Sequence, residues 1–176
     1  FKFNNSYTNE AGNVSFASNA GTSFTTDRFG TSNGAININN TGSIATIPNL
    51  IYGNGARTVC VWVKLNSFNA SGYNFLYSYG APSTSQSNGG AINSSLAFHL
   101  GYNNNHSVAT TNTVGVWYFM AFTYDGTTSR IYKNGVLLGS APYSWNTVNS
   151  GSSFFKIGIG VGNELQFNGA LDDLQI

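Results

Sequence analysis

Short apolar runs separated by clusters of Gly, Asn and Ser recur along the whole chain. No long segment combines a helical hydrophobic period with capping residues, so the pattern is typical of β-strands. The predicted strands are 35–39, 58–65, 74–79, 96–102, 116–124, 128–133, 136–140, 154–159 and 170–176. So many strands in one domain predict an all-β fold, a two-sheet antiparallel β-sandwich.

The clearest local signal is a hairpin centred on Asn134 and Gly135, which stand between two apolar runs. Both residues tolerate positive φ, as a type I′ turn requires. This turn pairs Lys133 with Val136, and Ile131 with Leu138.

Two predicted strands are apolar on both faces. In 58–64 the valines line one face while Cys60 and Trp62 line the other, and aromatic residues occupy both faces of 116–122. Such strands lie centrally in a sheet, with a loop or a ligand over the second face. Trp62 and Trp117 are therefore predicted to be core residues.

Four predicted loops are long and polar, and loops of this length are often functional. They are 67–73, 80–93, 103–112 and 142–153.

Composition limits the partners. The 176 residues suit one domain, and only 7% of them are charged, whereas 15% are aromatic. A net charge of +1, from seven scattered Lys and Arg residues, excludes a convincing basic patch for nucleic acid and argues against an anionic membrane surface. No apolar run is long enough to span a membrane. The abundance of Asn, Ser, Thr and Gly favours a neutral, hydroxyl-rich ligand.

Cysteine usage adds a point about origin. The single cysteine, Cys60, allows no intrachain disulfide and is predicted to be a buried small hydrophobe rather than a reactive thiol. A secreted domain without disulfides is more typical of bacteria than of eukaryotes.

Four segments, in order along the chain, resemble the laminin G-like jelly-roll domains of the concanavalin A-like lectin/glucanase superfamily. They are the opening strand and Asn-rich loop at 3–13, the Arg28-Phe29-Gly30 turn into a strand, the strand 57–64 with its Trp, and the closing set at 117, 124–126, 132–135 and 167–176. The resemblance implies a single jelly-roll domain over residues 1–176. Both ends of the sequence resemble strands cut close to their limits, which predicts a domain excised from a larger secreted or cell-surface protein. One fold hosts many functions, so it constrains function less than fold.

The resemblance also implies a structural calcium ion, held by the last strand and the opening loop. Its expected ligands are Asn4, Asn9 and Asp172 with backbone carbonyls, since calcium binds carboxylate, amide and carbonyl oxygens. This sequence has Asn where family members often have Asp at positions 4 and 9, which leaves the site with fewer charges. If Asp172 shares the core face with Leu174 and Ile176, it points inward. The alternative is that Asp172 accepts hydrogen bonds from the backbone of the opening loop.

Other polar residues have simpler interpretations. Asp125, before Gly126, is predicted to be a turn residue that binds its own backbone. Asp27, beside Arg28, is predicted to be structural. His99 and His106 lack the spacing of a catalytic zinc site.

A sugar site needs an aromatic platform beside amides and carboxylates. The first candidate is Trp145, with Tyr143 and Asn146 in the same polar loop. A second polar-aromatic cluster lies at the end of a predicted strand and consists of Tyr102, Asn103, Asn104, Asn105 and His106. Tyr73 is a weaker candidate. The alternative for Trp145 is that its ring folds back to cover the sheet.

The sequence therefore predicts a non-catalytic, lectin-like module that binds a neutral polysaccharide. Its predicted location is outside the cell or at the cell surface, and it is expected to be a monomeric domain of a multidomain chain. Glycosidases of this superfamily use paired carboxylates, but the two glutamates, Glu10 and Glu164, lie far apart in loops. No nucleophile-elbow motif is present either. The other function considered is an adhesin or spacer domain that makes protein contacts.

Overall fold

The computed structural model describes residues 1–70, 72–150, 154–164 and 167–176. The strands in these ranges are β1 (Thr22–Thr25), β2 (Ala35–Asn39), β3 (Ser43–Thr46), β4 (Arg57–Leu65), β5 (Asn74–Gly80), β6 (Ser87–Ile92), β7 (Leu96–Leu100), β8 (His106–Ala109), β9 (Trp117–Tyr124), β10 (Thr128–Lys133), β11 (Val136–Pro142), β12 (Phe154–Ile157) and β13 (Asn168–Gln175).

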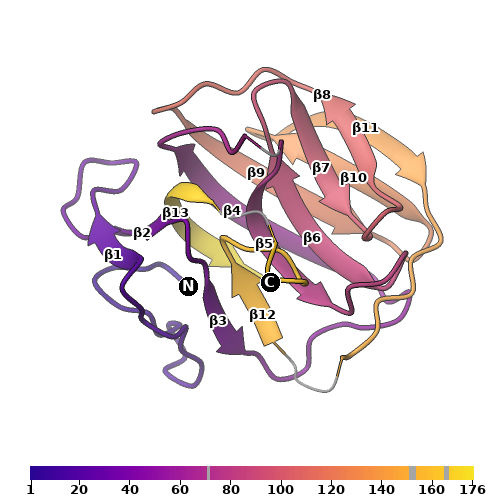
Figure 1. Ribbon diagram of the computed structural model, residues 1–176, viewed down its shortest axis with the longest axis horizontal. Helices are drawn as coiled ribbons and strands as arrows, with labels where there is room; N and C mark the ends of the chain where they lie inside the picture. Colours follow the sequence, from indigo (N-terminus) through magenta and orange to yellow (C-terminus); the bar gives the residue numbers. More distant parts are fainter. Residues whose placement is uncertain (71, 151–153, 165–166) are drawn as a thin grey trace.

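The strands form two antiparallel sheets that pack face to face (Figure 1). The seven-stranded sheet has the order β1-β2-β13-β4-β9-β10-β11, and the six-stranded sheet has the order β3-β12-β5-β6-β7-β8. The predicted β-sandwich of the jelly-roll kind is confirmed. No described segment forms a helix that is long and apolar enough to cross a membrane.

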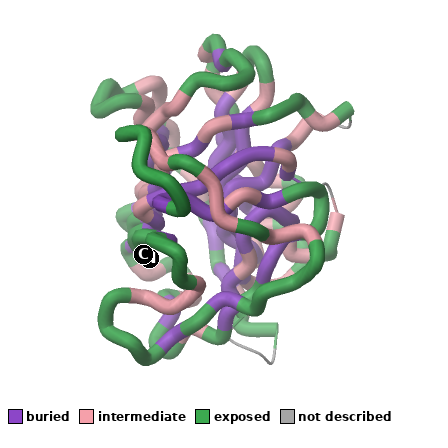
Figure 2. Tube along the Cα trace, turned by 90° about the vertical axis from the view of Figure 1, so that its left-hand side faces the viewer, coloured by how far each residue is buried: buried purple, intermediate pink, exposed green. Residues whose placement is uncertain are grey.

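The core lies between the two sheets. On β4 the side chains of Val59, Val61 and Val63 are buried, while the residues between them are more exposed, as expected for a strand with one face on the core. The facing sheet contributes Tyr77 and Phe155, whose rings stack with centroids 5.6 Å apart. Figure 2 shows the buried strands enclosed by exposed loops.

All nine predicted strands are present, and four strands were missed: β1, β3, β6 and β8. The clearest miss is β6, which lies inside the predicted polar loop 80–93. Its glycines look like loop residues, but packing explains them. A Cβ at Gly90 would lie 2.5 Å from a ring carbon of Tyr77 and 2.7 Å from one of Phe122, so only glycine fits between these rings.

The hairpin prediction is confirmed with one correction. Asn134 and Gly135 both have positive φ, and Lys133 pairs with Val136 as predicted. Ile131 pairs with Gly139 rather than Leu138, because a β-bulge shifts the register between Ile131 and Tyr132.

The prediction that Trp62 and Trp117 are core residues is wrong. Both lie half-buried on the outer face of the seven-stranded sheet, and the same is true of Cys60. The ring centroids of Trp62 and Phe119 are 5.5 Å apart, and the guanidinium carbon of Arg28 lies 4.9 Å from the centroid of the Trp62 ring. A second apolar face therefore need not belong to the core, because aromatic and cationic side chains can cover one another at the surface.

Candidate functional site

Trp145, the predicted sugar platform, is fully buried. Its ring stacks on Tyr143 at 4.7 Å and meets the ring of His99 edge-on at 4.6 Å, and its Nε1 donates a hydrogen bond to the carbonyl of Asn104 at 2.8 Å. Neither face is open to a sugar. The observed arrangement is the alternative considered from the sequence, in which the ring folds back over the sheet.

The neighbours of Trp145 are also engaged. Tyr143 lies between the rings of Trp145 and His106, and its hydroxyl donates to the carbonyl of Asn105. The amide of Asn104 donates to Ser85 Oγ. Asn146 is exposed at a shallow depression. These predicted residues hold the loop after β7 in place rather than forming an aromatic platform.

A polar network lies between the two sheets beneath this loop. Ser129 Oγ is 2.8 Å from Nδ1 of His99 and 2.9 Å from Nδ1 of His106, and Asn88 Nδ2 is 3.0 Å from Nε2 of His99. Burial lowers the pKa of both imidazoles, that of His99 strongly, with added repulsion of His99 by Arg57. Neutral imidazoles bridged by one hydroxyl suit a structural role. Among the described residues, no three His, Cys, Asp or Glu side chains are grouped so that they could hold a metal ion.

Asp172 does not point into the core as predicted. It pairs with Trp62 on the outer face, whereas its neighbour Leu171 pairs with Val63 and is buried. A bulge at Asp173, whose φ is 47°, then returns Leu174 to the core. The inserted residue breaks the two-residue period on which the prediction rested.

Asp172 is bound by a cation from its own chain. The guanidinium of Arg28 donates to Oδ2 of Asp172 and also to Oδ2 of Asp173. Burial raises the pKa of Asp172 to about 6, and the charge of Asp173 adds to this, while Arg28 acts in the opposite direction.

The residues around Asp172 do not fit a calcium ion. Its carboxylate faces a guanidinium, which would repel a divalent cation. Asn9 Oδ1 already accepts hydrogen bonds from the backbone N–H groups of Asn13 and Val14. Asn4 is exposed. Calcium needs about six to eight oxygen ligands, and two of the three predicted ligands, Asp172 and Asn9, are already engaged by Arg28 and by backbone N–H groups.

The turn assignments are confirmed. Asp125 accepts hydrogen bonds from the backbone of Thr127 and Thr128 and from Arg130, which together hold the pKa of its carboxyl well below the usual range. Asp27 accepts from the backbone N–H groups of Phe29 and Thr31.

A separate hollow lies on the outer face of the six-stranded sheet. This groove lies over β5, β6 and β7, and it is bounded by the loop after β7 and by the loop after β12. Figure 1 shows these three strands as neighbours in one sheet. Its lining is Tyr73, Phe75, Ser78, Ser87, Asn88, Gly89, Leu100, Tyr102, Asn103, Asn105, Val161 and Glu164. Its volume of about 220 Å³ is below the roughly 300 Å³ of a typical small-molecule pocket, which suits one sugar ring of a chain.

The groove has an apolar side and a polar side. Phe75 and Leu100 belong to a small buried cluster, and Tyr73 packs against its edge with its ring 6.0 Å from that of Phe75. On the polar side, the side chains of Tyr102, Asn103 and Glu164 make no hydrogen bond with any residue that the structure describes. They are therefore available to a ligand.

Tyr102 and Asn103 have an unusual backbone. Both residues are left-handed, with φ of 51° and 57°. This conformation is costly for a bulky residue such as tyrosine, and such strain gathers at binding and catalytic sites. A hydrogen bond within the same loop helps to hold this strained conformation in place, since Asn105 Oδ1 accepts from the N–H of Gly101.

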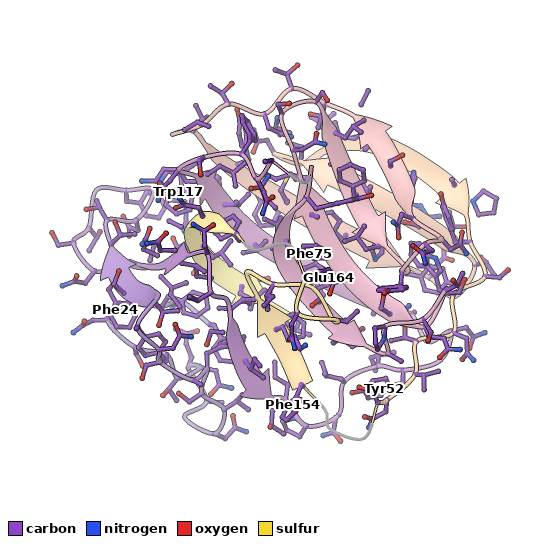
Figure 3. All side chains as sticks on the ribbon, in the orientation of Figure 1. Phe24, Tyr52, Phe75, Trp117, Phe154 and Glu164 are labelled. Atoms are coloured by element: carbon purple, nitrogen blue, oxygen red, sulfur yellow. The ribbon has the colours of Figure 1, made fainter. Side chains whose placement is uncertain are left out.

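Glu164 is placed by two glycines. A Cβ at Gly160 would lie 2.5 Å from Glu164 Oε1 and 3.0 Å from Cζ of Phe75, and one at Gly162 would lie 2.5 Å from Glu164 Oε2. The carboxylate therefore rests against the loop backbone, close to the tip of the Phe75 ring (Figure 3). The loop itself is tied to the sheet, because Ser78 Oγ donates to the carbonyl of Ile159.

Of the residues predicted for sugar binding, Tyr102 lines this groove together with Asn103 and Asn105 of the same cluster, and the weaker candidate Tyr73 joins them there. Phe75 and Glu164 were missed. The paired glycines around Glu164 were the one available signal, since they mark a loop in which side chains approach the backbone closely.

Sequence comparison identifies the family. Residues 38–176 match the family model described as the concanavalin A-like lectin/glucanases superfamily, and the chain belongs to this family. A search of curated proteins finds no matching relative.

Several solved structures share the fold. Domain 4 of an extracellular arabinanase from Geobacillus stearothermophilus, in complex with arabinotriose, has a TM-score of 0.71 and 18% identity, over 98% of this chain and 87% of that chain. The binding domain of botulinum neurotoxin serotype G has a TM-score of 0.64 and 13% identity, over 92% of this chain and 42% of that chain. A heptameric SAP-like pentraxin from Limulus polyphemus has a TM-score of 0.56 and 16% identity, over 77% and 69%.

Proposed function

We propose that the chain is a non-catalytic carbohydrate-binding module and that the groove on its six-stranded sheet binds one ring of a neutral polysaccharide. The observation that carries this proposal is the strained backbone at Tyr102 and Asn103. Their polar side chains line the same groove as the aromatic rings of Tyr73 and Phe75. Strain is retained where it positions groups for a ligand.

The groove offers both interactions that a sugar needs. The rings of Tyr73 and Phe75 can pack on the C–H face of a sugar, while Asn103, Asn105 and Glu164 can bind its hydroxyl groups. Strands form the floor, so the site is largely preorganised, which lowers the entropic cost of binding.

The comparisons support the same class of function. The arabinanase domain is solved with an oligosaccharide and comes from an extracellular enzyme. For this chain we infer a location outside the cell or at its surface, as a monomeric domain of a larger secreted bacterial protein.

Two features support binding rather than catalysis. Glu164 is the only carboxylate on the described lining of the groove, whereas glycoside hydrolysis uses two. Ser129, the hydroxyl that contacts two histidines, is fully buried between the sheets and inaccessible to a substrate.

An array of neutral oligosaccharides that includes arabinotriose tests the proposal. Tyr102→Ala should abolish binding, and Tyr132→Ala, on the outer face of the other sheet, should leave it unchanged. Binding that responds equally to both changes would place the site outside the groove.

The second candidate is an adhesin or spacer domain that contacts protein. The burial of Trp145 and the aromatic outer face around Trp62 and Phe119 favour it. A folded chain that binds no glycan on the array would make it the leading function.

A further inference from the structure

We infer that Glu164 sets the charge specificity of the groove, so that it admits neutral sugars and rejects uronic acids. This inference rests on the proposed function, and it names the class of glycan that the same site takes.

Glu164 is the only carboxylic acid among the described residues of the lining, and none of these residues is a lysine or an arginine. The remaining polar groups are hydroxyls and amides. A uronic acid carboxylate in the groove would therefore meet a like charge and no cation on the lining itself.

Lys156, on the neighbouring strand β12, is the cation that interacts with Glu164. Burial lowers the pKa of the Lys156 ammonium, and the carboxylate of Glu164 acts to raise it. With Glu164 charged, the positive charge of Lys156 is therefore already partly offset. Its ammonium donates to the carbonyl of Val161 at 2.7 Å and to Oδ1 of Asn163 at 2.8 Å. These bonds hold the loop after β12 in shape, and Lys156 is not part of the groove lining.

The position of the Glu164 carboxylate is fixed closely enough to discriminate. It rests between Gly160 and Gly162, where any added methyl group would overlap its oxygens, and it lies beside the ring tip of Phe75. A sugar whose C–H face packs on Phe75 therefore presents its edge substituents to this carboxylate. Hydroxyl groups there donate charge-assisted hydrogen bonds, whereas a carboxylate is repelled.

Rejection of a competing ligand by like charge is a common way to build specificity. Two unit charges about 4 Å apart interact by about 1 kcal/mol even in water and by more near a protein surface. We expect uronic acids to bind at least about fivefold more weakly than their neutral counterparts, which is that minimum energy converted to a ratio.

The test compares neutral and acidic trisaccharides on one array: cellotriose with cellotriuronic acid, α-1,4-galactotriose with trigalacturonic acid, and arabinotriose. The native chain should bind the neutral member of each pair at least about fivefold more tightly than its acidic counterpart. Glu164→Gln, which keeps size and removes charge, should gain binding to an acidic member.

The chain offers a matched control, since its only other glutamate, Glu10, pairs with Lys2 at the surface. Glu10→Gln changes net charge equally and should leave the pattern unaltered. Gly162→Ala gives an independent variant, because its methyl group displaces the Glu164 carboxylate without removing it. Thermal unfolding confirms that each variant is folded.

The outcomes separate the two proposals. Equal binding of neutral and acidic members by the native chain, or no gain of acidic binding in folded Glu164→Gln, overturns the charge specificity and leaves the proposed function intact. Absence of binding to every member overturns both.

Discussion

Arg28 and Asp172 form an ion pair on the outer face of the seven-stranded sheet, and the same guanidinium reaches Asp173. The guanidinium carbon Cζ of Arg28 also lies 4.3 Å from the centroid of the Phe29 ring and 4.9 Å from the centroid of the Trp62 ring. One side chain thus ties the loop before β2 to the bulge of β13 and to the middle of β4.

Replacing Arg28 with alanine should lower the free energy of unfolding by about 3 kcal/mol, since loss of one partner leaves a buried carboxylate uncompensated. Chemical denaturation at pH 8 measures this loss. The loss should shrink at pH 4, where Asp172 is protonated. Arg130→Ala is the control: its pair with Asp125 is exposed, so its effect should be much smaller.

Chelation should not change the stability of the chain. Because Arg28 takes the position next to Asp172 that a metal would need, thermal unfolding in EDTA and in millimolar calcium should give the same melting temperature. A drop in melting temperature with EDTA that calcium restores would reinstate the predicted ligands Asn4, Asn9 and Asp172.

Stability should fall as the pH is lowered from 6.5 to 5. The pKa of buried His99 is well below its ordinary value of 6.5, so the unfolded chain takes up a proton that the folded chain refuses. This loss is at most about 1.4 kcal/mol per pH unit for one group.

The pKa of Asp172 acts with the opposite sign. It is about 6 in the folded chain and 3.8 ordinarily, so its contribution to stability is greatest below pH 3.8 and declines as the pH rises to 6. His99→Gln should flatten the fall between pH 6.5 and 5, and Asp172→Asn should steepen it. Denaturation curves at several pH values check both slopes, and an unchanged slope in His99→Gln would exclude the imidazole as their source.

Gly101→Ala should destabilise the loop that follows β7. The added methyl group would lie 2.2 Å from Nε1 of buried Trp145 and 2.7 Å from the carbonyl of Asn104. Overpacking of this kind costs about 1–3 kcal/mol. Near-ultraviolet circular dichroism should report the displaced indole, and glycan affinity should fall because Tyr102 and Asn103 follow directly. Unaltered stability would show that the loop can yield.

The strands could be predicted from the sequence because alternation and turn residues are local signals. The hairpin at Asn134 and Gly135 needed only the tolerance of two residues for positive φ. The face of Asp172 could not be predicted, because one bulged residue at Asp173 reverses the alternation. Likewise β6 could not be predicted from local signals, because the glycine at position 90 is required by the close approach of two rings, from β5 and β9, that are distant in sequence.

The groove was harder to predict than the fold. Tyr102 was identified as an aromatic residue among amides, but its partners come from β5 and from the loop after β12. Glu164 lies some sixty residues beyond it and reaches the groove only through the shape of its own glycine-rich loop. Trp145 was predicted to be a sugar platform because it lies in a polar loop. Loops can fold back, however, and the hydrophobic effect favours burial of its large ring.

The left-handed backbone at Tyr102 and Asn103 gives opposing selection pressures on these two positions. Glycine would adopt the same φ without steric cost, so a chain selected for durability alone would drift towards glycine there and lose the rim of its groove. Retention of tyrosine and asparagine at a strained turn would be the mark of a lineage in which recognition of a ligand still matters, and a set of homologous sequences would reveal which pressure has prevailed.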